Sequence, residues 1–164
     1  MKKAVIIAIL LSLSFSLSYS QSKLKLDSLL IPLLEIDNSK DIATTPQAKQ
    51  IIQYGDKMLP ILAVYFSDTT HTKIKSECQN VYLTKGEVAI ILADRIELMP
   101  YATLTGVQNC ILDFCKNNSN LIEYYLFAIR RVGAITFQKK YAEWLVSKDR
   151  TEWPPYLNNS KKKN

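Results

Sequence analysis

Histidine is almost missing from this chain, which has a single one, His71, among 164 residues. Cysteine is limited to three residues, and no two of them form a Cys-x-x-Cys pair. Structural zinc sites need four ligands at short, paired spacings, so we expect no metal and no other cofactor. A Cys–His nucleophile pair would have to use His71. That residue falls in a polar stretch, where a histidine is more often only solvated.

Glycine is also scarce, and its four residues are never clustered. Loops that bind phosphate groups need closely spaced glycines before a helix, so the sequence excludes a nucleotide-binding loop of that kind. Each glycine instead falls near a predicted helix end. The glycines therefore indicate where helices begin and stop.

Most of the excess of basic residues lies at the two ends of the chain. The chain has 21 Lys and Arg against 15 Asp and Glu, but Lys2, Lys3 and Lys161 to Lys163 lie at its two ends. The rest of the chain has one more basic than acidic residue. A nucleic-acid-binding protein needs a concentrated basic face, so no nucleic acid is expected as a partner.

Long apolar runs are absent after the first twenty residues. Those twenty begin with Lys2 and Lys3, continue with the apolar run 4–11, and end with Ser18 and Ser20, small residues before a cut ahead of Gln21. This order predicts a cleaved secretory signal peptide at 1–20. The alternative is an uncleaved anchor, but the run is shorter than the roughly 20 apolar residues that span a bilayer. We expect a mature protein of the bacterial periplasm or exterior without a stable membrane anchor.

Capping signals recur about every 15–20 residues in the remaining chain and predict an all-α fold. Thr45-Pro46 opens one helix, and Thr84 with Glu87 and Thr105 with Gln108 form capping boxes. We expect a compact bundle or a short HEAT-like array of about six or seven helices in a single domain, 21–150, followed by a Pro/aromatic segment and basic tail, 151–164. The expected helices are 27–36, 46–53, 57–66, 84–99, 105–116, 120–132 and 136–147.

The polar stretch 67–83 lacks any helical period and is predicted to be the longest loop, with 81–83 as the only short strand candidate. In the segment before it, residues 52–63 (IQYGDKMLPILA), with Asp68 after them, resemble a HEAT-type helical repeat, in which a Gly-Asp turn leads into an apolar helix. Segments 83–89 and 96–101 are similar to bacterial secreted proteins of unassigned function. These resemblances imply a helical exported protein and no particular activity.

The helix expected at 84–99 has an apolar arc wide enough to predict a central position. Its carboxylates, Glu87, Asp94 and Glu97, gather on the other side of the helix. Paired carboxylates can divide acid and base roles, and they can also form a charged outer face that meets a partner. Arg95 falls within the apolar arc and needs a partner from another element, and Asp113 and Glu123 are the candidates. The alternative for Arg95 is a bound anion or carboxylate ligand.

The three cysteines leave two possibilities in an oxidising compartment. Cys110 and Cys115 lie five residues apart on one expected helix and point about 140° apart, so they cannot bridge each other. Either one of them pairs with Cys78, or all three are buried thiols.

An aromatic pair and the absence of a catalytic set favour a protein-binding function. Tyr124 and Phe127 lie on the expected helix 120–132, where Phe127 falls on the polar side and could mark a partner surface. We expect a secreted protein-binding module, in its most concrete form a periplasmic immunity or inhibitor protein against an envelope-acting toxin or hydrolase. The alternatives are a small hydrolase that uses the three carboxylates and a structural or ligand-carrying envelope protein.

Overall fold

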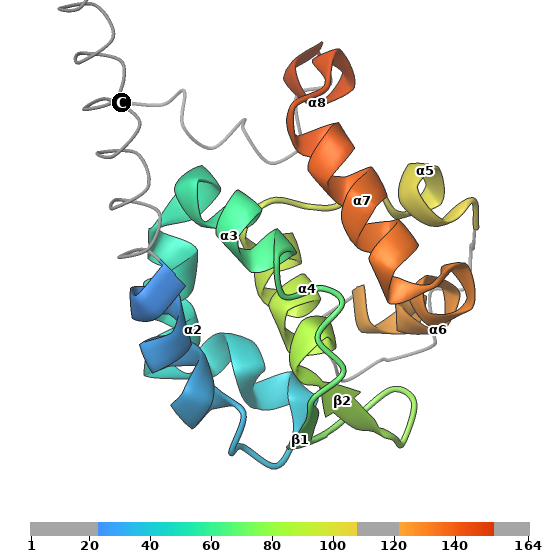
Figure 1. The fold of residues 1–164 in the computed structure, drawn as a ribbon. Coiled ribbons are helices and arrows are strands. Elements are labelled where there is room, and N and C mark those ends of the chain that lie inside the picture. The colour runs from blue at the N-terminus through green and yellow to red at the C-terminus, as the bar shows by residue number, and fades with distance from the viewer. Residues whose placement is uncertain (1–22, 108–121, 153–164) are drawn as a thin grey trace, which may run out of the picture.

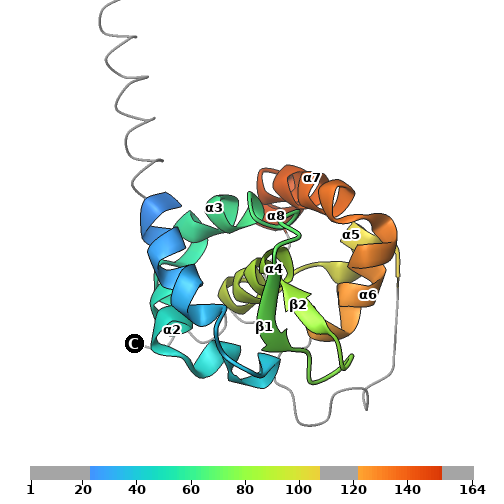
Figure 2. The same ribbon diagram turned by 60° about the horizontal axis from the view of Figure 1, so that its bottom comes forward.

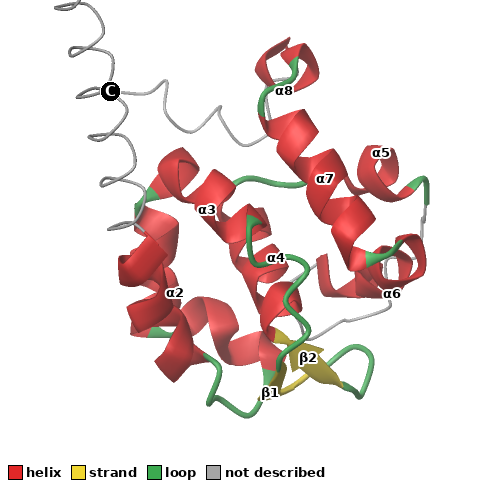
Figure 3. Cartoon of the chain, viewed as in Figure 1, coloured by secondary structure: helices red, strands yellow, loops and turns green. Residues whose placement is uncertain are grey.

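The computed structural model describes residues 23–107 and 122–152, and most of these are helical (Figure 3). Helical residues 23–33 precede η1 (Ser39–Thr44), α2 (Pro46–Gln53), η2 (Gly55–Met58), α3 (Leu59–Ala63), β1 (His71–Lys75), β2 (Tyr82–Thr84), α4 (Lys85–Ile96), α5 (Tyr101–Thr105), α6 (Ile122–Val132), α7 (Ala134–Leu145) and α8 (Lys148–Glu152). The predicted helical class is confirmed, with a small two-stranded sheet in addition. The expected signal peptide and basic tail lie outside the described residues.

Helix α4 occupies the centre of the fold. The other helices and the hairpin of β1 and β2 surround it (Figures 1 and 2), and every residue from Gly86 to Ala93 is buried. The predicted capping box begins this helix: Thr84 Oγ1 accepts a hydrogen bond from the Glu87 amide at 3.2 Å, and Glu87 Oε2 accepts one from the Thr84 amide at 2.8 Å. A helix buried on all sides needs apolar residues all round, and this explains its wide apolar arc.

Several predicted helix boundaries are wrong, because the effect of a proline or a glycine on a helix depends on the structure around it. The first helix does not begin at Pro32 or break there; it runs through Pro32 and ends at residue 33. The segment expected as one helix at 57–66 is divided into η2 and α3, and Asp56 does not cap it. Thr105 ends α5 in front of Gly106, whose φ of 71° suits a helix end. The rest of the helix predicted at 105–116, from residue 108 on, lies outside the described residues.

The largest error in the predicted fold concerns the stretch 67–83, which was expected to be a loop and contains most of an antiparallel hairpin. The strand candidate at 81–83 is confirmed to within one residue by β2, whereas β1 was not predicted. His71 pairs with Thr84 and Lys75 with Tyr82, with an irregularity between these pairs. Residues 34–38 run along the other edge of β1, where Leu34 and Asp37 accept hydrogen bonds from the amides of Lys73 and Lys75. In β1 only Ile74 is fully buried, so the strand has too few apolar residues for alternation to be visible.

Tyr141 is the one buried side chain whose polar atom has no hydrogen-bond partner among the described residues. Its ring packs against Phe66 and Trp144, with centroid distances of 4.9 and 5.6 Å. Burial raises the pKa of its hydroxyl far above the usual tyrosine value. The ring therefore stabilises the core, whereas the hydroxyl is desolvated without compensation.

We expect Tyr141→Phe to raise the free energy of unfolding by about 1 kcal/mol, because it removes this hydroxyl and keeps the ring contacts. Urea unfolding measures the change. Tyr65→Phe is the matched control: the Tyr65 hydroxyl donates to Asp27 Oδ1 at 2.7 Å, so its loss should lower stability. A lower stability of Tyr141→Phe would mean that this hydroxyl is hydrogen-bonded after all, for example to a bound water.

Candidate functional site

The three carboxylates of the α4 segment do not form an exposed arc, contrary to the sequence-based expectation. Glu87 is buried and pairs with Arg130 Nε at 2.5 Å. Asp94 accepts hydrogen bonds from the Tyr101 hydroxyl and the Met99 amide. Each acid is thus held by a partner within the chain, because the other elements pack on this side of the helix as well.

The third acid, Glu97, is held just as firmly at the end of α4. Both of its carboxylate oxygens accept hydrogen bonds from the guanidinium of Arg150, the shortest at 2.7 Å, and Arg150 also lies 3.5 Å from Asp56. The hydrogen bond to Glu97 raises the pKa of Arg150. Burial raises the pKa of Asp94 above the ordinary aspartate value. The ion pairs of Glu87 with Arg130 and of Glu97 with Arg150 connect α4 to α6 and α8. The three acids do not converge on one site where an acid–base pair could act on a substrate.

The buried carboxylate of Glu123, on α6, binds the turn of the hairpin through hydrogen bonds. Glu123 is 0% exposed, and its Oε1 accepts hydrogen bonds from the hydroxyl of Ser39 at 2.9 Å, from the hydroxyl of Ser76, and from the amide of Cys78 at 3.3 Å. We call these four residues the Glu123 cluster. Ser39 belongs to η1, while Ser76 and Cys78 belong to the turn of the hairpin. One carboxylate therefore joins three parts of the fold.

Two further contacts fix the same turn. The side-chain amide of Gln79 donates to the Glu123 carbonyl at 2.8 Å and accepts from Arg130 Nη1 at 2.5 Å. Cys78 is disulfide-bonded, which excludes it as a thiolate nucleophile activated by His71. Cys110 and Cys115 lie outside the described residues, so the choice between them stays open.

The proposed ion pair of Arg95 stays a prediction. Arg95 is partly buried at the end of α4, and Asp113 lies outside the described residues. Glu123 accepts the hydrogen bonds of the Glu123 cluster. Burial separates the two aromatic residues predicted to face a partner: Tyr124 is buried at 8% exposure, while Phe127 is 41% exposed and packs edge-on against it. Of that pair, Phe127 alone presents a surface to a partner.

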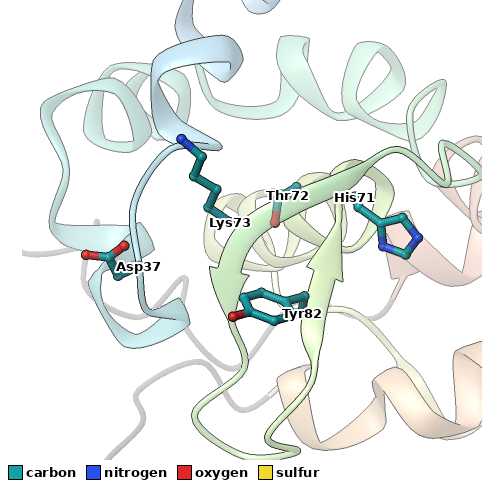
Figure 4. Close-up of a pocket in the computed structure, with 5 residues that line it drawn as sticks. All are labelled: Asp37, His71, Thr72, Lys73 and Tyr82. Carbon is teal, nitrogen blue, oxygen red and sulfur yellow. The ribbon is translucent and has the colours of Figure 1, made fainter.

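The outer face of the hairpin carries a pocket of about 480 Å³. It is lined by Asp37, which precedes η1, by His71, Thr72 and Lys73 of β1, and by Tyr82 of β2. Figure 4 shows the Tyr82 ring lying across this face, with Asp37 and His71 on opposite sides of it. Tyr82 is 60% exposed and the neighbouring Val81 is 41% exposed. A large aromatic side chain is thus exposed on β2, next to a turn that the Glu123 cluster holds in place.

Sequence reasoning missed this pocket, because four of its five residues fall in the stretch expected to be a loop. Its only signal is weak: His71, Lys73 and Lys75 are exposed while Ile74 between them is buried, the alternation of a strand with one solvated face. Asp37 comes from a distant part of the chain. It reaches the pocket because the 34–38 segment pairs with β1.

Among the described residues, no three His, Cys, Asp or Glu side chains lie close enough together to hold a metal ion. None of the described helices is long and apolar enough to cross a membrane. The candidate site is the pocket formed by the hairpin and the segment beside it. Comparison with protein-family models, with curated proteins and with solved structures finds no match to this chain.

Proposed function

We propose that this protein is an exported helical module that binds another protein through the outer face of the β1–β2 hairpin. The observation that carries the proposal is Tyr82 of β2, 60% exposed in the lining of the pocket, next to a turn that the Glu123 cluster holds and that contains the disulfide-bonded Cys78. Exposed tyrosines are frequent energetic centres of protein interfaces. A surface that is already rigid loses little conformational entropy on binding.

The alternative partner surface on α6 has weaker support. Phe127 is exposed, but Tyr124 beside it is buried, and the α4 carboxylates that would accompany them are held within the chain. The charged outer face expected to meet a partner therefore loses its basis. A binding surface built on the hairpin does not need those acids.

The finer version of the proposal is a periplasmic immunity or inhibitor protein. The N-terminal pattern before Gln21 supports export, because a charged start, a short apolar run and small residues precede the cut. An inhibitor of an envelope-acting toxin or hydrolase needs a pre-formed binding surface, and the hydrogen bonds that fix the turn of the hairpin support this role. N-terminal sequencing of the exported protein, expected to begin at Gln21, tests the export.

The binding proposal is tested with a photo-reactive phenylalanine analogue in place of Tyr82, and with the same analogue in place of Ile135 as a control. Ile135 is 77% exposed on α7. In the native host, irradiation should link position 82, but not position 135, to one dominant protein that mass spectrometry identifies. Proteins encoded beside the gene are the first candidates to examine.

With that partner purified, Tyr82→Ala should weaken binding at least tenfold, about 1.4 kcal/mol, because an interfacial aromatic anchor is lost. Ile135→Ala and Phe127→Ala should change the dissociation constant less than twofold. Calorimetry measures all three variants. Weaker binding by Phe127→Ala with unchanged binding by Tyr82→Ala would contradict the proposal and place the interface on α6.

A further inference from the structure

We infer that the hairpin pocket binds a basic side chain of the partner, an arginine in its best-fitting form, between the Asp37 carboxylate and the Tyr82 ring. This inference rests on the proposed function and specifies the chemistry of that surface. It follows from the balance of charges around the pocket and from the shape of its aromatic wall.

The positive charge of Lys73 is already compensated. Its Nζ lies 2.5 Å from Glu35 Oε2, and this contact raises the pKa of Lys73. Figure 4 shows the Lys73 side chain extending away from Tyr82. An acidic group entering the pocket would therefore have to share the Lys73 ammonium with Glu35. The pocket has no other lysine or arginine in its lining.

The negative charge of Asp37 is only partly compensated: it attracts Lys73 through space and helps to raise the pKa of that lysine, after the larger effect of Glu35. The backbone carbonyl of Asp37 accepts from the Lys75 amide, but its side-chain carboxylate forms no ion pair or hydrogen bond with the described part of the chain. Asp37 is exposed and lines the pocket. It is thus an acceptor with both oxygens available, pre-positioned by a hydrogen-bonded backbone.

Tyr82 supplies the second element of recognition. Its exposed ring lies across the outer face of the hairpin, with the hydroxyl end toward the side of Asp37 (Figure 4). Cations bind over the faces of aromatic rings, and a guanidinium both stacks on such a ring and donates two parallel hydrogen bonds to a carboxylate. Lysine offers one point charge instead, so arginine fits this pair of groups better.

The size and remaining wall of the pocket agree with such a ligand. A volume of about 480 Å³ lies in the range of clefts that take small ligands, about 300–1,000 Å³. The Thr72 hydroxyl donates to the Leu83 carbonyl and is occupied within the hairpin. The Asp37 carboxylate therefore determines the sign of the charge that the pocket accepts.

The test uses the exported protein and two blocked tripeptides, acetyl-Gly-Arg-Gly-amide and acetyl-Gly-Glu-Gly-amide. Because His71 is the only histidine and lines the pocket, its imidazole C–H signals give an unambiguous NMR reporter. Both peptides are titrated at the same fixed pH and low ionic strength, at which ionic contacts are least screened. The arginine peptide should shift the His71 and Tyr82 ring signals with a millimolar dissociation constant, and the glutamate peptide should not.

Asp37→Asn should weaken binding of the arginine peptide at least fivefold, because the charge is lost while the exposed position tolerates the amide. Asp149→Asn, at an exposed acid of α8, is the matched control and should leave binding unchanged. Equal or tighter binding of the glutamate peptide, full binding by Asp37→Asn, or no shift with either peptide would each overturn the inference. If position 82 crosslinks to a partner whose binding is unaffected by Asp37→Asn, the proposed function stands and the arginine pocket falls. If the arginine peptide binds but no partner is linked at position 82, the arginine pocket stands and the proposed function falls.

Discussion

Replacing Gly86 by alanine is expected to destabilise the protein by about 3 kcal/mol or more, a large part of the stability of an ordinary domain. A Cβ at this position would lie 2.5 Å from the Phe66 carbonyl oxygen, 2.8 Å from that of Tyr65 and 2.9 Å from that of Asp68. All three are backbone atoms, so no side chain can rotate out of the way. The first turn of α4 would have to move off the 65–70 segment, to which the amides of Lys85 and Gly86 donate hydrogen bonds.

The sign of this effect is opposite to the one that helix propensity predicts. Alanine ordinarily stabilises a helix by about 0.5–1 kcal/mol relative to glycine. Gly55→Ala is the control: its φ of 61° is strained for alanine, but no atom lies within 4 Å of the added Cβ, so the cost should be about 1–2 kcal/mol. Thermal and urea unfolding, followed by circular dichroism, rank the two variants. A Gly86→Ala protein as stable as the wild type would show that the approach of α4 to the 65–70 segment is looser than described.

Glu123→Ala is expected to lower the free energy of unfolding by about 3–5 kcal/mol, the second large effect, because several buried neutral donors lose their acceptor at about 1–3 kcal/mol each. The substitution removes the acceptor shared by the hydroxyls of Ser39 and Ser76 and the amide of Cys78. Buried donors without an acceptor lose the hydration that they have in the unfolded chain. Partner binding through Tyr82 should weaken together with stability, because the hairpin turn is no longer fixed to α6 and η1.

Glu123→Gln separates the loss of the acceptor from the loss of the charge. Glutamine keeps a carbonyl oxygen for the same donors, so the expected cost is smaller, about 1–2 kcal/mol. Glu143→Ala, at an exposed acid of α7, should stay within about 0.5 kcal/mol of the wild type. Urea unfolding of the three variants gives the comparison. Equal stability of Glu123→Ala and Glu143→Ala would mean that the Glu123 cluster does not hold the hairpin.

Local capping signals predicted those parts of the fold in which neighbouring residues determine the backbone. The Thr84 and Glu87 box begins α4 as expected, Thr45 caps α2, and α6 ends before Gly133. These signals work because the capping partners lie within three residues of each other, so packing elsewhere scarcely changes them. Thr105 shows the limit of the method, since the same residue types close α5 where Gly106 turns the chain.

The hairpin could not be predicted in the same way. Strand β1 contains one fully buried residue, Ile74, and its partners are Tyr82–Thr84 and the distant 34–38 segment. Strand pairing depends on which segments meet, and the residues themselves carry little intrinsic preference. The candidate pocket shares this difficulty, because Asp37 and Tyr82 come together only after that pairing.

Charged residues were the least predictable feature, because their positions along a helix do not reveal what packs over them. The sequence pattern predicted that Glu87 and Glu97 lie on an outer face. In the structure they pair with Arg130 and Arg150 from later helices. Glu123 reads as an acid in a first turn and is fully buried beneath the hairpin. Folding brought cations and hydroxyls to these acids, since a buried carboxylate is tolerated only with such partners.

The amino-acid sequence alone was enough to establish a mostly helical chain and the start of its central helix. Those conclusions rest on composition and on contacts between near neighbours. The tertiary structure decided the rest. It shows that Gly86 is required for close packing and that the α4 carboxylates are bound by partners within the chain. It also shows that Tyr82 and Asp37 line the same pocket. Each of these depends on residues far apart in the chain, whose meeting is determined by the packing of the whole core.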